Sequence, residues 1–245
     1  MSLFFISWPA CEKVRTVRTF SLLAANAADD DGAKYLFPMQ PGASILQAEG
    51  LSFRYSPSPA VPLFHALSLA LPPGVTFLGG DEGTGKTTLL KLLAGVFPTS
   101  GQLRIQGVSL AQNPTAYRRQ VAWLNPRDTA LDGQTAKQIF AALPHCEPGV
   151  LQAHIDGLSL AHHLDKTLAM MSTGTRRKML LAAALAAQAP VTLLDQPFKA
   201  LDRPSIDYLL RVLNDAARQP GRACVVADYE APPGVDLASV IELGV

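Results

Sequence analysis

The chain has 245 residues, which is enough for one or two domains with a substantial buried core. Its 21 Lys and Arg residues nearly balance its 20 Asp and Glu residues, so the composition excludes the strongly basic surface of a nucleic-acid-binding protein. Hydrophobic residues make up 48% of the sequence, which excludes a disordered chain. The 3 cysteines lie far apart without a C-x-x-C spacing, as expected of free thiols in a reducing compartment.

No segment of the sequence has the length and hydrophobicity of a membrane-spanning helix. The longest stretch without Asp, Glu, Lys or Arg, residues 55–80, is interrupted by prolines, and the apolar stretch 179–194 is too short. The apolar residues 3–8 precede basic residues, which is the reverse of the order in a secretory signal. We therefore expect a cytoplasmic chain.

Residues 1–43 lack a sustained hydrophobic period and contain the run Asp29-Asp30-Asp31-Gly32. We expect a disordered leader here, with a targeting or docking segment as the alternative.

Regular structure begins near Ser44. Apolar or alternating segments bounded by Gly and Pro predict strands over residues 45–55, 63–71, 75–78, 191–194 and 223–227, with a hairpin-like piece at 103–105. Helical periodicity is found at residues 87–94, 176–188 and 205–217, and residues 128–171 are expected to be mostly helical. This alternation predicts an α/β fold with a mostly parallel sheet covered by helices.

A glycine-rich segment follows the predicted strand 75–78. Gly80-Asp81-Glu82-Gly83-Thr84-Gly85-Lys86-Thr87 fits the pattern G-x-x-x-x-G-K-[ST]. Gly80, Gly83 and Gly85 let the backbone curl so that successive N–H groups converge on a phosphate, and the following helix adds the positive end of its dipole. Lys86 brings a full charge to the outer phosphates, and the Thr87 hydroxyl is a ligand for Mg²⁺. The alternative is a plain glycine turn between a strand and a helix.

The second half of such a site is an acidic residue at the end of another buried strand. Val191-Thr192-Leu193-Leu194-Asp195 supplies it, and Asp195 is expected to hold Mg²⁺. Many strands end in Asp, so this feature becomes informative only together with the glycine loop.

From Ser44 onward the sequence resembles the ATP-binding subunits of ABC transporters. The resemblance rests on Tyr55, the glycine loop, the segment Met171-Ser172-Thr173-Gly174-Thr175 before a helix, Asp195, and Lys199-Ala200-Leu201-Asp202 in this order. It implies that residues 44–245 form a nucleotide-binding domain with a P-loop NTPase core sheet that has helices on both faces, a small antiparallel β subdomain, and a helical subdomain at about residues 128–185. It also implies that ATP and Mg²⁺ bind, with Tyr55 stacking on adenine and Thr88 joining the glycine loop at the phosphates.

The resemblance further implies that two ATP-binding subunits pair head to tail. The segment 171–175 stands where the family has its L-S-G-G-Q signature, and Ser172 and Gly174 match it. By this likeness, Ser172 and Gly174 contact ATP held by the opposite subunit. The alternative is that Ser172 only caps the helix. Arg176, Arg177 and Lys178 crowd the first turn of that helix, where the dipole disfavours cations, and a bound anion there would relieve the conflict.

Three positions depart from the family pattern. Gln196 replaces the glutamate that acts as base for the attacking water, and Asp228 stands in the place of a histidine near the γ-phosphate. Pro126 aligns with a glutamine that links Mg²⁺ to the helical subdomain, although Asn125 is one residue away. A carboxamide cannot accept a proton at neutral pH, so we expect ATP binding with slow turnover at this chain's own site. The alternative is that Gln196 positions the water and ordinary activity survives.

The leading hypothesis is therefore the ATP-binding subunit of a membrane transporter, peripheral on the inner face of the membrane. Its partners would be separate membrane-spanning permease subunits and a second ATP-binding subunit, identical or different. The alternative is a nucleotide-gated regulatory or adaptor protein without ATPase activity. A P-loop kinase or GTPase is disfavoured because it would not account for the segment 171–175.

Overall fold

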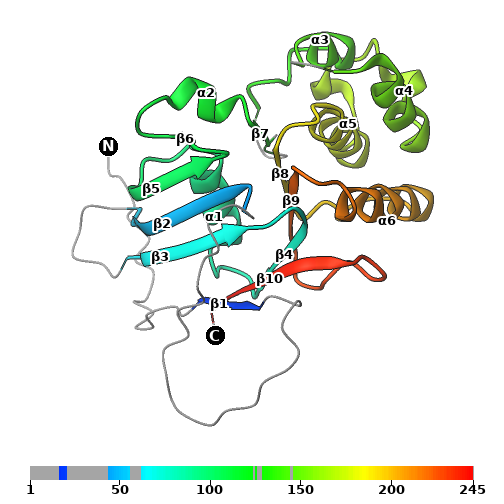
Figure 1. The fold of residues 1–245 in the computed structure, drawn as a ribbon. Coiled ribbons are helices and arrows are strands. Elements are labelled where there is room, and N and C mark those ends of the chain that lie inside the picture. Colours follow the sequence, from blue (N-terminus) through cyan, green and yellow to red (C-terminus); the bar gives the residue numbers. More distant parts are fainter. Residues whose placement is uncertain are drawn as a thin grey trace, which may run out of the picture.

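The structure is a computed structural model that describes residues 17–20, 44–55, 62–123, 125, 129–143 and 146–244 (Figure 1). Pro126, Asp128 and Pro144, on which parts of the sequence interpretation depend, lie outside the described residues. The described chain folds into two sheets with helices packed on both, which confirms the predicted α/β class.

The larger sheet has six strands, and all but one of them are parallel. Its strands are, in spatial order, β1 (Val17–Phe20), β10 (Leu237–Leu243), β4 (Gly74–Gly80), β9 (Ala223–Ala227), β8 (Val191–Asp195) and β7 (Val121–Ala122). The carboxyl ends of β4, β9 and β8 lie side by side, because Leu78 is opposite Ala227, and Ala227 is opposite Asp195.

The smaller sheet is antiparallel and has four strands, which are β3 (Phe64–Leu71), β2 (Leu46–Phe53), β5 (Ser100–Ile105) and β6 (Val108–Ser109) in spatial order. This is the small β subdomain that the family resemblance implies. Its strands alternate between buried and exposed residues, as in β5, since only one face of the sheet is covered.

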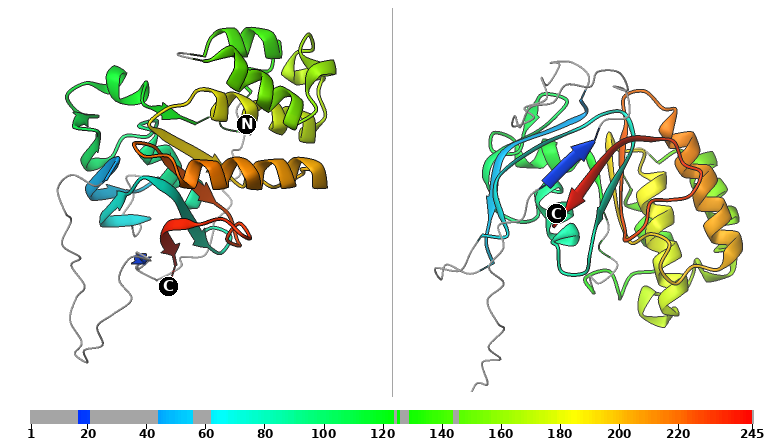
Figure 2. Two further views of the ribbon diagram at one scale, coloured as in Figure 1. Left: turned by 45° about the vertical axis from the view of Figure 1, so that its right-hand side comes forward. Right: turned by 90° about the horizontal axis from the view of Figure 1, so that it is seen from below.

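Six α-helices and two short 3-10 turns connect the strands in the described chain. They are α1 (Lys86–Leu93), α2 (Pro114–Arg118), α3 (Ala136–Ala141), α4 (Pro148–Gly157), η1 (Ala161–His163), η2 (Leu168–Met170), α5 (Thr173–Ala186) and α6 (Arg203–Ala217). Figures 1 and 2 show α5 and α6 on one side of the larger sheet, and α1 with the smaller sheet on the other.

The strands of the larger sheet divide their side chains between two cores. In β9, Val225 packs with α1 and the smaller sheet, whereas Cys224 and Val226 pack with α5 and α6. In β8, Leu193 and Leu194 divide in the same way. Both faces of β8 and β9 are therefore buried, which is why the sequence shows these two strands as continuous apolar runs rather than alternating patterns.

The segment expected to be mostly helical contains α3, α4 and the two 3-10 turns, followed by α5. This helical unit is joined to the core by a contact between α4 and α6. Nδ1 of His154 lies 2.8 Å from the Tyr208 hydroxyl, which donates to the Ala153 carbonyl oxygen at 3.0 Å. Because that hydroxyl has one proton, His154 is the donor to Tyr208, and the imidazole is held in its Nδ1–H form.

The edge of the larger sheet was not foreseen from the sequence. Val17–Phe20, inside the segment expected to be a disordered leader, forms β1 and pairs antiparallel with β10 from Val17 opposite Leu243 to Phe20 opposite Val240. The remainder of residues 1–43 lies outside the described residues. Within the described ranges, no helix is both long enough and apolar enough to cross a membrane.

The burial of His154 predicts a pH dependence of stability. Burial lowers the pKa of His154 below its ordinary value of 6.5. Between that lowered pKa and 6.5 the unfolded chain binds more protons than the folded chain, so the free energy of unfolding falls as the pH falls, by at most ~1.4 kcal/mol per pH unit. Chemical denaturation between pH 7.5 and 5.5 measures this. We expect His154→Gln to remove this contribution, and the exposed control His162→Gln to retain it. An identical pH dependence in wild type and His154→Gln would contradict the assignment.

Candidate functional site

Residues from three segments meet at the carboxyl edge of the larger sheet. The glycine loop leaves the end of β4, Asp195 ends β8, and Asp228 follows β9. The Asp228 N–H donates to the Leu78 carbonyl oxygen at 3.2 Å, which ties the end of β9 to β4. The crevice beyond the carboxyl ends of parallel strands is the usual ligand site in open α/β sheets.

The glycine loop has a backbone that side chains would obstruct. Gly80 has φ 136° and Gly85 has φ 103°, both in the region that favours glycine. A Cβ at Gly80 would lie 2.6 Å from the Leu243 carbonyl oxygen, and one at Gly85 would lie 3.0 Å from the Phe64 ring. The Thr84 hydroxyl closes the loop by donating to the Asp81 carbonyl oxygen at 2.8 Å. Helix α1 then begins at Lys86 without a side-chain cap, so its first amides remain available to an anion.

Lys86 is a buried cation, with 7% of its surface exposed. Its ammonium donates to the carbonyl oxygens of Gly80 and Asp81, the latter at 3.0 Å, and lies 4.4 Å from the centre of the Tyr229 ring. Burial lowers its pKa, and the nearby Asp228 and Asp195 carboxylates partly offset this effect. The ammonium thus has several negative groups around it, but its hydrogen bonds go to uncharged carbonyls.

Thr87 and Asp195 form the contact between α1 and β8. The Thr87 hydroxyl donates to Oδ2 of Asp195 at 2.8 Å, although the two residues are 108 positions apart. A hydroxyl beside a carboxylate presents oxygen donors of the kind that Mg²⁺ prefers. In the described chain no three His, Cys, Asp or Glu residues cluster as a metal site, so a magnesium ion here would depend on phosphate oxygens and water for its other ligands.

Gln196 directly follows Asp195 and has a strained backbone. Its φ is 47°, a left-handed conformation that costs energy in a residue with a side chain. Three hydrogen bonds hold it there. Its N–H donates to the Ala227 carbonyl at 2.8 Å, and its own carbonyl accepts from the Lys199 N–H at 3.2 Å and from Nη1 of Arg177 at 2.6 Å. The backbone conformation at this position is therefore set by main-chain contacts and by α5, independently of the carboxamide.

Asp228 stands beside these groups as a partly buried acid. Burial raises its pKa, as does the Asp195 carboxylate, while the Tyr229 N–H, Lys86 and Arg177 act in the opposite direction. Its Oδ1 accepts from the Tyr229 N–H at 2.9 Å.

Tyr55 lies two residues after the end of β2 and contacts α1. Its hydroxyl is hydrogen-bonded to Oγ1 of Thr88, and its ring meets Phe53 edge to face with centroids 4.9 Å apart. The residue remains 68% exposed. The ring is thus oriented by Phe53 and Thr88 while much of its surface is free to stack on a flat apolar group.

Ser172 is the N-cap of α5, and Gly174 lies in its first turn. Contacts within the chain explain why each of these residue types is found at its position. Ser172 caps the helix by accepting from the Thr175 N–H at 3.1 Å. A Cβ on Gly174 would lie 2.9 Å from the Ala200 carbonyl oxygen, so the close approach of that loop requires glycine. Neither observation excludes a role toward a ligand, because Ser172 remains exposed.

The three cations in the first turns of α5 all have partners in the chain. Arg176 pairs with Asp132 at 2.8 Å, Lys178 pairs with Asp202 at 2.9 Å, and Arg177 donates to the Gln196 carbonyl. Hydrogen bonding to the Ser205 side chain, together with the Lys178 ammonium, lowers the pKa of Asp202 to about 2. The unfavourable placement of these cations is thus compensated by internal contacts and does not itself require a bound anion.

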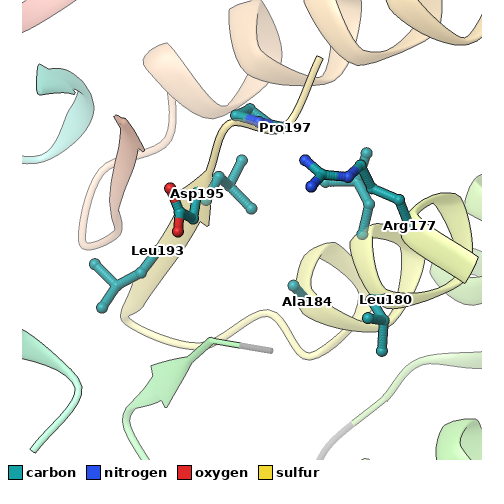
Figure 3. A pocket seen from close by; sticks show the side chains of 8 residues that line it. Arg177, Leu180, Ala184, Leu193, Asp195 and Pro197 are labelled. Atoms are coloured by element: carbon teal, nitrogen blue, oxygen red, sulfur yellow. The ribbon is translucent and has the colours of Figure 1, made fainter. Parts of the chain in front are cut away.

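The structure therefore brings Gly80, Gly83, Gly85, Lys86, Thr87, Asp195, Gln196 and Asp228 together at one edge, while Tyr55 contacts Thr88 of α1. The sequence interpretation missed two contacts at this edge, that of Arg177 with Gln196 and that of Tyr229 with Lys86. Arg177 extends from α5 toward the segment after β8 and, with Asp195 and Pro197, lines a pocket between α5 and β8 (Figure 3). Tyr229 covers Lys86. The cation crowding was visible in the sequence, but nothing in the sequence distinguishes Tyr229 from an ordinary surface aromatic.

These residues fit a nucleoside triphosphate with Mg²⁺. In the glycine loop, a Cβ at Gly80 or Gly85 would collide with neighbouring atoms. Helix α1 begins with backbone amides that no side chain caps, and the buried Lys86 ammonium lies beside them. Thr87 and Asp195 supply oxygen ligands on the same side.

Comparison with known proteins shows which family the chain is similar to. A sequence profile of the ABC transporter family matches residues 64–199, more than half of the chain. The cytochrome c biogenesis ATP-binding export protein CcmA of Pseudomonas syringae pv. syringae is 31% identical over 191 residues, covering 75% of this chain and 87% of that protein. ATP-binding cassette sub-family A member 7 of Rattus norvegicus is 31% identical over 186 residues, which are 72% of this chain but only 8% of that protein.

Solved structures show the same fold. An ATP-binding subunit of an ABC transporter matches with a TM-score of 0.66 and 22% identity over 75% of this chain and 80% of that chain. A bacterial Atm1-family ABC exporter with ATP bound matches with a TM-score of 0.62 and 20% identity over 76% of this chain and 35% of that chain. Because the profile match covers more than half of the chain, and a relative of 31% identity matches 75% of it, the chain belongs to the ABC transporter family.

Proposed function

We propose that this chain is the ATP-binding subunit of an ABC-type membrane transporter, and that its own hydrolytic site is impaired. The observation that carries the proposal is the edge of the larger sheet, where the glycine loop, the buried Lys86 and the Thr87–Asp195 pair lie together. Relatives of similar length, such as the CcmA proteins, have names that describe ATP-binding export proteins, which supports a transport role.

The residues at this edge have distinct tasks toward ATP. The amides at Gly83, Gly85 and the start of α1 bind phosphate oxygens, and Lys86 neutralises the outer phosphates. Thr88 lies beside them, and the exposed Tyr55 ring stacks on the base. Thr87 and Asp195 hold Mg²⁺. Transport is driven by the binding of Mg-ATP and by the cleavage of its phosphoanhydride bond.

Impaired hydrolysis follows from the two altered side chains. The carboxamide of Gln196 donates and accepts hydrogen bonds, so it orients a water molecule, but it has no basic group to take the proton. Asp228 places a second carboxylate beside Asp195, which opposes a negatively charged phosphate. The groups that hold ATP are retained, whereas those that act on the attacking water are replaced.

Pairing and membrane attachment complete the proposal. Ser172 and Gly174, at the exposed start of α5, contact ATP on a second ATP-binding subunit, and separate permease subunits hold the pair at the inner face of the membrane. The likeness of the chain to a lipid A-core flippase of Xanthomonas campestris, 27% identical over 85% of this chain, supports a membrane partner. If the chain does not attach to permease subunits, the alternative function is that of a regulatory or adaptor protein.

Binding of Mg-ATP is the first test. We expect calorimetry to detect Mg-ATP binding to the wild-type chain, and Lys86→Gln to weaken it at least ~10-fold because a charge-assisted contact to phosphate is lost. Thr87→Val should weaken binding only when Mg²⁺ is present. Lys137→Gln removes a charge from an exposed side chain of α3 and serves as the control. No heat with the wild-type chain would refute the proposal.

Turnover tests the impairment. We expect slow steady-state phosphate release from the wild-type chain and a rate about 10²-fold higher for Gln196→Glu, the lower end of the effect of a general base. The double variant Gln196→Glu/Asp228→His should be at least as fast, and the exposed control Gln134→Glu should match wild type. A wild-type rate equal to that of both repaired variants would show that the site is not impaired.

Pairing is tested at Ser172. Sedimentation velocity should show that Mg-ATP drives the chain into a dimer with a second copy, and Ser172→Asp should prevent it by placing a negative charge against the outer phosphate. Aspartate caps helices as well as serine does, so α5 is expected to remain folded, which circular dichroism checks. Dimers that form equally in wild type and Ser172→Asp would exclude this segment from the interface.

A further inference from the structure

Tyr229 lies over the ammonium that is central to the site. It follows β9 directly after Asp228, and its N–H donates to Oδ1 of Asp228 at 2.9 Å. Asp228 is in turn held against β4 through the Leu78 carbonyl. This places the Tyr229 ring 4.4 Å from Nζ of Lys86, while 51% of the residue surface stays exposed. A cation at this distance from a ring is attracted by the negative ring face.

The surroundings of Nζ leave little room for a further partner. An ammonium group has three N–H donors. Two partners are the carbonyl oxygens of Gly80 and Asp81, and the Tyr229 ring is a third. A phosphate oxygen that contacts Lys86 must therefore displace the ring or one of the carbonyls.

The ring is the partner that can leave. Gly80 ends β4 and is paired with Leu243 of β10, so its carbonyl moves only with the sheet. The Asp81 carbonyl accepts both the hydroxyl and the N–H of Thr84, at 2.8 and 3.3 Å, and belongs to the closed loop. The Tyr229 side chain extends from a half-exposed residue and leaves by rotating about its own bonds.

We propose that Tyr229 is a positioning residue that competes with the outer phosphates of a nucleotide for the Lys86 ammonium. The proposal rests on the proposed function, since it concerns the same triphosphate site. The Tyr229 ring keeps Lys86 shielded and turned toward the glycine loop, and a nucleotide gains the ammonium only by expelling the ring. The ring therefore lowers the affinity for nucleotides that have β- and γ-phosphates, and it does not affect groups that bind elsewhere in the site.

Calorimetry on the full chain distinguishes this role from simple packing. We expect Tyr229→Ala to bind Mg-ATP about two- to fivefold more tightly than wild type, the size of a partly exposed cation–π contact. Tyr229→Phe retains the ring and should match wild type. AMP, measured by competition with a fluorescent nucleotide, lacks outer phosphates and should bind all three proteins alike. A merely structural tyrosine would give the opposite sign, with weaker binding after its removal.

Several results would overturn the proposal. Equal or weaker Mg-ATP binding by Tyr229→Ala would show that the ring does not compete, and a Tyr229→Phe variant that behaves like Tyr229→Ala would assign the effect to the hydroxyl. Equal tightening of AMP and ATP would place the effect away from Lys86. If wild type binds no Mg-ATP, the proposed function fails and this inference fails with it, whereas binding without a Tyr229 effect refutes the inference alone.

Discussion

The site depends on a positive charge that is buried at the edge of a sheet. Removing an ammonium from water is costly unless nearby groups replace its hydration. Lys86 obtains this replacement from two loop carbonyls and an aromatic ring, with the carboxylates of Asp195 and Asp228 close by but not hydrogen-bonded to it. In the proposed function, the glycine loop, the uncapped start of α1 and the aligned ends of three strands bring an anion to this charge.

In the proposed function, binding and chemistry depend on different parts of the chain. The groups for binding are backbone amides, Lys86, and the Thr87–Asp195 pair, which also joins α1 to β8. The position for chemistry is Gln196, whose left-handed backbone is held by Ala227, Lys199 and Arg177. Since those bonds use only the main chain of residue 196, its side chain can change from carboxylate to carboxamide without disturbing the fold.

The start of α5 shows how internal packing and a ligand role can coincide. Ser172 caps the helix, Gly174 admits the Ala200 carbonyl, and Arg176, Arg177 and Lys178 are all paired within the chain. The crowding of cations that suggested a bound anion is thus a consequence of contacts with neighbouring segments. Arg177 in addition links this helix to Gln196, so that the segment proposed to face a second subunit is mechanically joined to the chain's own site.

The sequence by itself predicted the features that depend on short stretches of backbone. The glycine loop requires particular φ angles at Gly80 and Gly85, and buried strands require apolar runs such as residues 191–194, so both leave a local pattern. Only the tertiary structure decided three other features. These are the pairing of the edge strands β1 and β10, the packing of the Tyr229 ring against the Lys86 ammonium, and the hydrogen bond from Arg177 to the Gln196 carbonyl. Each of these contacts joins segments that are far apart in the chain. A tyrosine or an arginine makes such a contact without leaving a spacing or residue pattern in the sequence.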